Sequence, residues 1–124
     1  MAGYPDKPSG FGRVYREDTM TKLAITDNKG LHIIFDNGYT LSVQIGPGNY
    51  CHNRDMPMKD DFCGNVPDCD NAEIAIFDPD GEYVQLTESD DVRGWVDIDE
   101  IIDKASLLGR PNITSDEVIR LFGE

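Results

Sequence analysis

The sequence predicts an α+β fold: an antiparallel β-meander of four to five strands, packed by one C-terminal helix plus a short terminal helix. Two recognisable hairpin turns, alternating apolar and polar residues beside them, and helical spacing of apolar residues near the C-terminus lead to this prediction. A chain of 124 residues is long enough to bury one core, so we expect a single domain over residues 1–124. Within it, we expect residues 1–18, rich in glycine, proline and charge, to form a loosely ordered arm.

The first half of the sheet is predicted around the dipeptide Asn37-Gly38, which favours a two-residue type I′ turn. The three predicted strands are residues 21–26, 31–36 and 39–46. A two-residue turn places His32 opposite Val43, on the core side of the sheet. The middle strand then carries apolar groups on both of its faces. We therefore expect both faces of the sheet to be at least partly covered, for example by a helix.

A second hairpin is predicted where the turn residues 78–81 separate two apolar segments. Pro79 and Gly81 suit a type I turn followed by a bulge. The predicted strands are residues 72–77 and 82–86. Between the two hairpins, residues 46–71 form a long irregular loop. Structureless segments of this length are uncommon in compact domains and are often functional.

The C-terminal part of the chain predicts two helices. Asp97 and Glu100 match a capping box at the start of the first helix, Ile98–Leu108. Thr114 and Glu117 match a second capping box, which begins a short terminal helix. The apolar residues of the first segment recur at helical spacing, so we expect this helix to pack on the sheet.

The charge of the chain is strongly negative and unevenly distributed. The net charge is −13, and residues 55–103 alone hold 16 acidic and 2 basic residues. Direct nucleic-acid binding needs clustered Lys and Arg, so we expect none, and anionic membranes repel such a chain. No apolar segment is long enough to span a bilayer, and the N-terminus lacks a signal-peptide pattern. Three cysteines, an odd number, favour a reducing compartment, so the predicted location is cytoplasmic.

The acidic segment predicts a surface for a protein partner with a basic surface. Trp95, the single tryptophan, is a candidate anchor for such a partner. The candidate partner-binding residues are Asp78, Asp80, Glu82, Glu88, Asp90, Asp91 and Trp95. The alternative interpretation is an ordinary solvated surface, with Trp95 packing the helix onto the sheet.

The glycine-rich start of the long loop suggests a different site. Its backbone N–H groups could face an anion, and Arg54 could pair with a phosphate. The candidate ligand-binding residues are Gly46, Gly48, Asn49, Tyr50, His52 and Arg54. No Walker lysine follows and Pro47 removes one donor, so the alternative interpretation is a sharp bend at the end of a strand.

The same loop holds all three cysteines, which raises the possibility of zinc. The candidate metal ligands are Cys51, His52, Cys63 and Cys69. No C-x-x-C pair is present, and the alternative is a set of free thiols. Cys51 and His52 are adjacent, so in an extended segment they point in opposite directions. No motif places a base beside a nucleophile, so we predict no catalytic residues, no required cofactor and no enzymatic activity.

The run FDNGYTLSVQIGPGNYC, residues 35–51, resembles a recurring core of small bacteriophage proteins of uncharacterised function. The resemblance continues in AEIA, residues 72–75, and in the Gly94-Trp95 dipeptide before a helix, and it covers roughly residues 30–108. It implies a phage origin and expression in the cytoplasm of a bacterial host, and it carries no chemistry that transfers to particular residues.

These observations leave three functional hypotheses. We expect a non-enzymatic phage accessory protein that binds and inhibits a host bacterial protein, for example as an anti-defence factor, through an acidic face. The alternative is a small-ligand protein that binds or sequesters a nucleotide signal with the Gly46–Arg54 loop. The third hypothesis is a metal-stapled interaction module.

Overall fold

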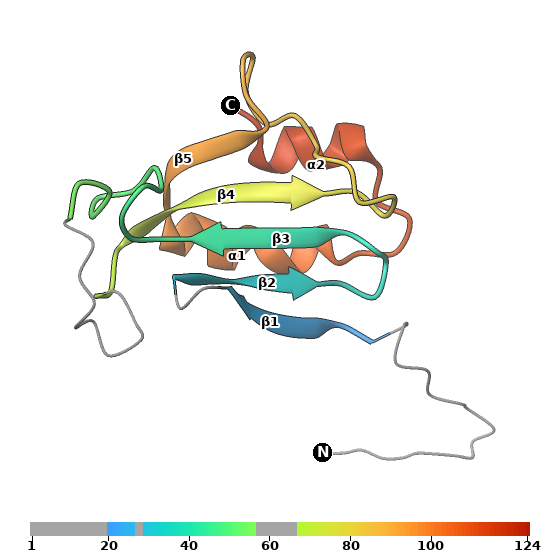
Figure 1. Ribbon diagram of the computed structural model, residues 1–124. Helices are drawn as coiled ribbons and strands as arrows, with labels where there is room; N and C mark the ends of the chain where they lie inside the picture. The colour runs from blue at the N-terminus through green and yellow to red at the C-terminus, as the bar shows by residue number, and fades with distance from the viewer. Residues whose placement is uncertain (1–19, 27–28, 57–66) are drawn as a thin grey trace.

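A computed structural model describes residues 20–26, 29–56 and 67–124 of the chain, and Figure 1 shows their arrangement. The predicted arm over residues 1–18 and the candidate ligand Cys63 lie outside the described residues. The strands are β1 (Lys22–Thr26), β2 (Gly30–Ile34), β3 (Thr40–Gln44), β4 (Asn71–Phe77) and β5 (Val92–Asp97). The helices are α1 (Ile98–Leu108) and α2 (Ser115–Phe122).

The five strands form one antiparallel sheet in the order β1-β2-β3-β4-β5, so each strand pairs with its neighbour in sequence. Both helices lie behind the sheet in the view of Figure 1. The α+β meander packed by C-terminal helices is therefore confirmed. None of the helices in the described part of the chain is long and apolar enough to cross a membrane.

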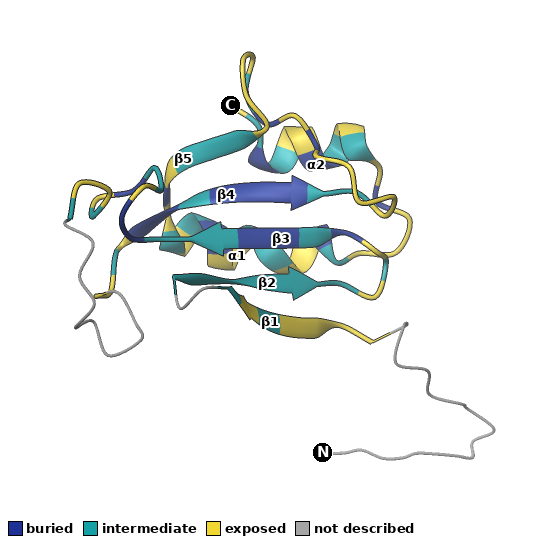
Figure 2. Ribbon diagram, in the orientation of Figure 1, coloured by how far each residue is buried: buried dark blue, intermediate teal, exposed yellow. Residues whose placement is uncertain are grey.

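The core lies between the sheet and the helices. Leu41 on β3 and Ile74 and Ile76 on β4 are fully buried, and Figure 2 shows β4 as the most deeply buried strand. From the helices, Leu108 and Phe122 complete this core. Alternation decides which side chains enter it, because successive residues of a strand point to opposite faces.

The first hairpin has a different turn from the predicted one. Gly38 has a positive φ of 98°, whereas Asn37 does not, and the Phe35 N–H donates to the Tyr39 carbonyl at 2.8 Å. The loop therefore has three residues, ending in a left-handed glycine, rather than the two of a type I′ turn. Asn37 is held by the helix end instead: its Nδ2 donates to the carbonyl of Leu108 at 2.8 Å.

This turn moves the pairing of β2 and β3 by one residue. His32 pairs with Ser42, and Leu31 pairs with Val43. The prediction that His32 lies on the core side, opposite Val43, is therefore wrong, because a shift of one residue transfers a side chain to the other face. His32 lies on the face away from the helices, where its ring centroid is 6.0 Å from that of Phe77.

The second hairpin begins as predicted but does not continue. Phe77 and Tyr83 form an isolated bridge, and the Val84 N–H donates to the Ile76 carbonyl at 2.7 Å. Residues 82–86 are not a strand, so that prediction is wrong. The side of β4 that they would have joined is occupied by β5, because one side of a strand pairs with only one neighbour. No strand was predicted over β5, because Gly94 and a bulge interrupt its alternation.

The helix caps differ from each other. At α2 the predicted capping box is present: the Glu117 N–H donates to the Thr114 hydroxyl at 3.2 Å, and the Thr114 N–H donates to the Glu117 carboxylate at 2.9 Å. At α1, Asp97 makes no side-chain capping hydrogen bond, so the prediction of a capping box at the start of this helix is wrong. Glu100 is occupied elsewhere, since Arg93 of β5 donates to its carboxylate at 2.9 Å.

The face of the sheet away from α1 and α2 has no helix on it within the described ranges (Figure 1). Its cover comes from single side chains. The ring of Tyr83 packs on that of Phe77, with centroids 4.6 Å apart, and Tyr50 lies at one end of the sheet. The expected partial cover of the second face is therefore supplied by connecting segments.

Candidate binding site

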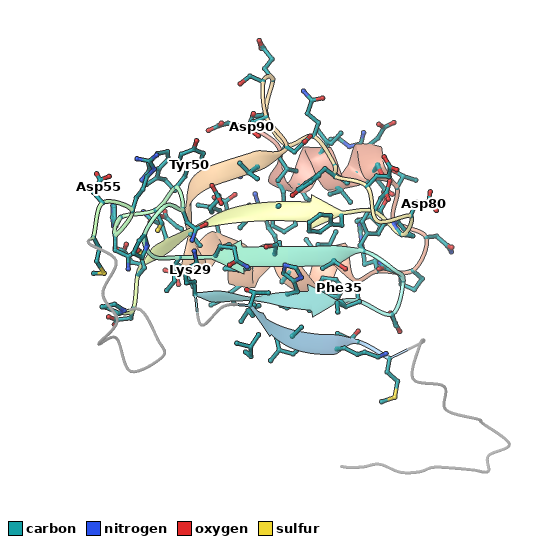
Figure 3. All side chains as sticks on the ribbon, viewed as in Figure 1. Lys29, Phe35, Tyr50, Asp55, Asp80 and Asp90 are labelled. Atoms are coloured by element: carbon teal, nitrogen blue, oxygen red, sulfur yellow. The ribbon has the colours of Figure 1, made fainter. Side chains whose placement is uncertain are left out.

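Trp95 and Tyr50 form an aromatic pair at the end of β5. Their ring centroids are 5.4 Å apart and their planes differ by 22°, which is a stacked arrangement. Trp95 is 54% exposed, although a large aromatic side chain in a sheet is usually covered. Figure 3 shows Tyr50 on the loop beside this end of the sheet. The pair brings together one residue from each predicted site: Trp95 from the partner-binding set and Tyr50 from the ligand-binding set.

Gly94 allows the loop to approach the sheet this closely. A Cβ atom added to Gly94 would lie 2.5 Å from Cβ of Tyr50 and 3.2 Å from its carbonyl oxygen. The Trp95 N–H donates to that carbonyl at 2.8 Å, and the Tyr50 N–H donates to Glu73 Oε2 at 3.3 Å. The loop therefore occupies backbone groups at the edge of β5, which would otherwise face solvent.

The backbone of Trp95 adopts an uncommon conformation. Its φ is 52°, in the left-handed region, and it lies in the β4–β5 irregularity between Ala72 and Ile74. For a bulky residue this conformation is an outlier that costs on the order of 1–3 kcal/mol. The bulge directs the indole onto Tyr50 and toward solvent. Such strain clusters at functional sites, so this residue is the strongest candidate in the described chain.

Charged groups surround the pair. The Arg54 guanidinium carbon lies 5.1 Å from the centre of the Tyr50 ring, and an Arg54 nitrogen is 3.5 Å from a carboxylate oxygen of Asp55. Burial raises the pKa of the Glu73 carboxyl above its usual range; the hydrogen bond from Tyr50 lowers it, and the charge of Asp90 raises it. The positive charges of Arg54 and Lys29 lower this pKa, so acidic and basic groups lie together at this end of the sheet.

The backbone N–H groups of the predicted ligand loop are used within the loop. Gly46 N–H donates to Asn53 Oδ1 at 2.8 Å, and Gly48 N–H donates to the Arg54 carbonyl at 3.1 Å. Asn49 N–H donates to the Gly46 carbonyl at 3.1 Å. Gly46 and Gly48 have φ values of 93° and 85°, so these glycines allow the backbone to bend sharply in the loop. An anion would have to displace these bonds to bind to the same donors.

The candidate metal ligands are only partly brought together. His52 Nδ1 lies 2.6 Å from Asp70 Oδ1, and His52, Cys69 and Asp70 line one shallow hollow. Cys51 is buried, and burial raises the pKa of its thiol, with a further contribution from neighbouring Cys69. Among the described residues, no group of three or more His, Cys, Asp or Glu side chains is placed to hold a metal ion. Because Cys63 lies outside them, the zinc hypothesis stays a prediction.

Two of the six predicted acidic residues, Asp78 and Asp90, use their carboxylates to hold turns. One oxygen of Asp78 accepts the N–H groups of Asp80 and Glu82 at 2.9 and 3.0 Å, and Asp90 Oδ1 accepts that of Asp91 at 2.7 Å. Figure 3 shows Asp80 and Asp90 at separate margins of the molecule. Of this set, Asp90 is the residue whose negative charge raises the pKa of Glu73. Asp90 therefore lies near enough to act on the end of the sheet where Glu73 and Trp95 are found.

Three searches, against protein-family models, curated proteins and solved structures, each found no match. The resemblance to small phage proteins stays a prediction.

Two residues of the site were not among the sequence candidates. Glu73 accepts the Tyr50 N–H, and Gly94 makes room for the Tyr50 side chain. A glycine inside an apolar strand often marks a bulge or the close approach of another segment. That signal was present in Gly94, but nothing in the sequence identified Tyr50 as the segment that approaches.

Proposed function

We propose that this protein is a non-enzymatic binding protein that holds a basic protein surface on the Tyr50–Trp95 pair. One observation carries the proposal: Trp95 is exposed although its backbone is held in a strained, left-handed conformation. The strained backbone keeps the Trp95 N–H on the Tyr50 carbonyl and the indole on the Tyr50 ring, yet over half of the residue stays exposed. We infer that this exposed part of Trp95 serves contact with a partner.

The chemistry around the pair favours a cationic partner group. The exposed face of an indole attracts an arginine or lysine head group, and this attraction strengthens when the pair is desolvated. Glu73 accepts the Tyr50 N–H and Asp90 acts on Glu73, so both add negative charge near the pair, where Arg54 and Lys29 supply the positive charges. The excess of 14 negative charges in residues 55–103 steers a basic partner toward this part of the chain over a longer range.

An exposed tryptophan that is already stacked on a second aromatic ring is suited to anchor a protein interface. Binding energy in protein interfaces concentrates in a few aromatic and arginine residues. Tyr50 holds the indole in place before binding, which reduces the entropy lost on association.

The resemblance to phage proteins supports a host bacterial protein as the partner. Occupying a basic functional surface of such a protein inhibits it without any catalytic group, as expected for an anti-defence factor. This inhibitory role rests on the resemblance, whereas the cationic partner chemistry rests on the residues around Trp95.

Fluorescence anisotropy with a labelled oligoarginine peptide tests the proposal. We expect binding that weakens as salt rises, because salt screens exposed charges. Trp95→Ala should weaken binding about 10-fold or more. Tyr83→Ala is the matched control: Tyr83 is 53% exposed and also packs on an aromatic ring, but it lies after β4, away from the pair. Equal losses in both variants, or no loss in Trp95→Ala, would contradict the proposal.

The nucleotide hypothesis keeps one supporting observation, the Arg54 guanidinium beside the Tyr50 ring. An aromatic ring can stack on a base and an arginine can pair with a phosphate. A nucleotide panel in a thermal-shift assay tests it. A shift that disappears in Arg54→Ala would favour the nucleotide, and a flat response across the panel would leave the basic protein as the partner.

A further inference from the structure

In the described part of the chain, the strand β1 is an open edge of the sheet. It pairs with β2 on one side, and no other strand within the described residues pairs with its second side. Its side chains Leu23 and Ile25 are 64% and 69% exposed, and Figure 2 shows β1 as the most exposed strand. A free strand edge with exposed apolar side chains is a template for pairing with another strand.

These two side chains point to the helix side of the sheet. Leu23 pairs with Ile33 of β2, and Ile25 pairs with Leu31, whose neighbour on β3 is Val43, a partly buried residue that packs against the core. The apolar layer between sheet and helices therefore continues onto β1, where its two apolar side chains are exposed. Another element placed beside β1 would extend this layer.

We propose that β1 pairs antiparallel with β1 of a second copy of this chain, about a two-fold axis at Ala24. With this axis, Leu23 lies opposite Ile25 of the partner subunit, and Ile25 lies opposite the partner's Leu23. Both apolar pairs fall on the same face, so the strand is complementary to itself, as a two-fold interface requires. The two sheets then join into one continuous sheet.

The charge distribution favours a second copy at this edge. Each chain carries −13, so two copies repel each other wherever their acidic segments meet. The strand β1 carries Lys22 and no acidic residue, and the segment 1–54 has 5 acidic and 6 basic residues. At the opposite edge, β5 follows Asp91 and ends in Asp97, and its Trp95 N–H already donates to the Tyr50 carbonyl. Two copies can thus approach through β1 with the least repulsion.

The strand has only 5 residues, so the interface is small. We expect a dimer that forms at protein concentrations on the order of 100 µM rather than a permanent one. Dimerisation leaves the Tyr50–Trp95 pair at the far edge of each subunit accessible (Figure 1).

Sedimentation velocity of the 124-residue chain over a range of concentrations tests this proposal. We expect the wild type to shift toward the dimer as concentration rises, and Ile25→Lys to remain monomeric. Ile102→Lys is the matched control, since Ile102 is 66% exposed but lies on α1. Circular dichroism checks folding, and Leu23→Lys serves as a second edge variant. A wild type that stays monomeric at about 1 mM, or edge variants that dimerise like the wild type, would overturn the proposal.

Discussion

At one edge of the sheet, β5 is covered by the loop that carries Tyr50, whereas at the other edge β1 has no further neighbour among the described residues. The covered edge is tied in three ways: a backbone hydrogen bond, an aromatic stack and the ion pair from Arg93 to Glu100 of α1. The open edge carries exposed Leu23 and Ile25. We propose that the strongly acidic part of this chain presents one edge to a cationic partner, and that the less acidic edge serves contact between apolar side chains.

The largest expected effect comes from filling the space at Gly94. Gly94→Ala places a Cβ atom 2.5 Å from Cβ of Tyr50, so the loop must move away from β5. Overpacking of this kind reduces the free energy of unfolding by about 1–3 kcal/mol. Urea denaturation measures the change.

Gly48→Ala is the matched control for this substitution. Gly48 lies in the same loop, and a Cβ atom added there has no neighbour within 4 Å, although its φ of 85° is strained for alanine. We expect it to lose about 1 kcal/mol from backbone strain alone, with the Tyr50–Trp95 stack intact. A smaller loss for Gly94→Ala than for Gly48→Ala would show that the loop does not pack on β5 as described.

The ion pair that ties β5 to α1 predicts a pH-dependent contribution to stability. Hydrogen bonding to Lys104 is the main reason that the pKa of Glu100 lies below its ordinary value of 4.5, with a further contribution from Arg93. A carboxyl group with a lowered pKa in the folded state stabilises the protein above pH 4.5, and this stabilisation is lost as the pH falls through the folded-state pKa.

Glu100→Gln should therefore reduce the free energy of unfolding at pH 7 by about 1–2 kcal/mol. The difference from the wild type should vanish on acidification below the folded-state pKa of Glu100. Denaturation midpoints measured from pH 7 to pH 3 check this expectation. Asp103→Asn is the control, because Asp103 is exposed on the same helix. A difference that persists at low pH would assign the effect to packing rather than to charge.

The smallest expected effect comes from two substitutions of Trp95. Their comparison distinguishes the cost of the left-handed backbone from the loss of the stack on Tyr50. Trp95→Gly and Trp95→Ala both remove the indole, but glycine adopts a φ of 52° without the steric cost that alanine has. We expect Trp95→Gly to be about 1 kcal/mol more stable than Trp95→Ala. Equal stability of the two variants would mean that residue 95 relaxes out of the left-handed region once the indole is gone. Thermal denaturation of the pair makes the comparison.

Much of the fold could be predicted from local sequence patterns. Alternation and turn residues gave the meander, and helical spacing predicted α1 with the bounds Ile98–Leu108. The register of β2 and β3 could not be predicted, because Asn37 is held by the carbonyls of Leu108 and Arg110, far away in sequence. This tertiary contact overrides the two-residue type I′ turn that Asn37-Gly38 favours on its own.

The candidate site was predictable in its parts but not in its assembly. Arg54 and Trp95 each had a chemical reason to be named, whereas Tyr50 was named only as part of the glycine-rich loop, and the three were assigned to two different sites. Their meeting depends on a bulge in β5 and on the absence of a side chain at Gly94. Both act through a contact between segments more than 40 residues apart, which no local pattern in one sequence reveals.

The intrinsic fluorescence of Trp95 tests the central claim most directly, because Trp95 is the single tryptophan of the chain and lies in the site itself. We predict that the free protein emits as an exposed indole, and that an oligoarginine peptide shifts or quenches this emission at low salt, with an oligoglutamate peptide as the inactive control. An emission spectrum that stays unchanged at saturating oligoarginine would contradict the account of Tyr50 and Trp95 as the binding surface.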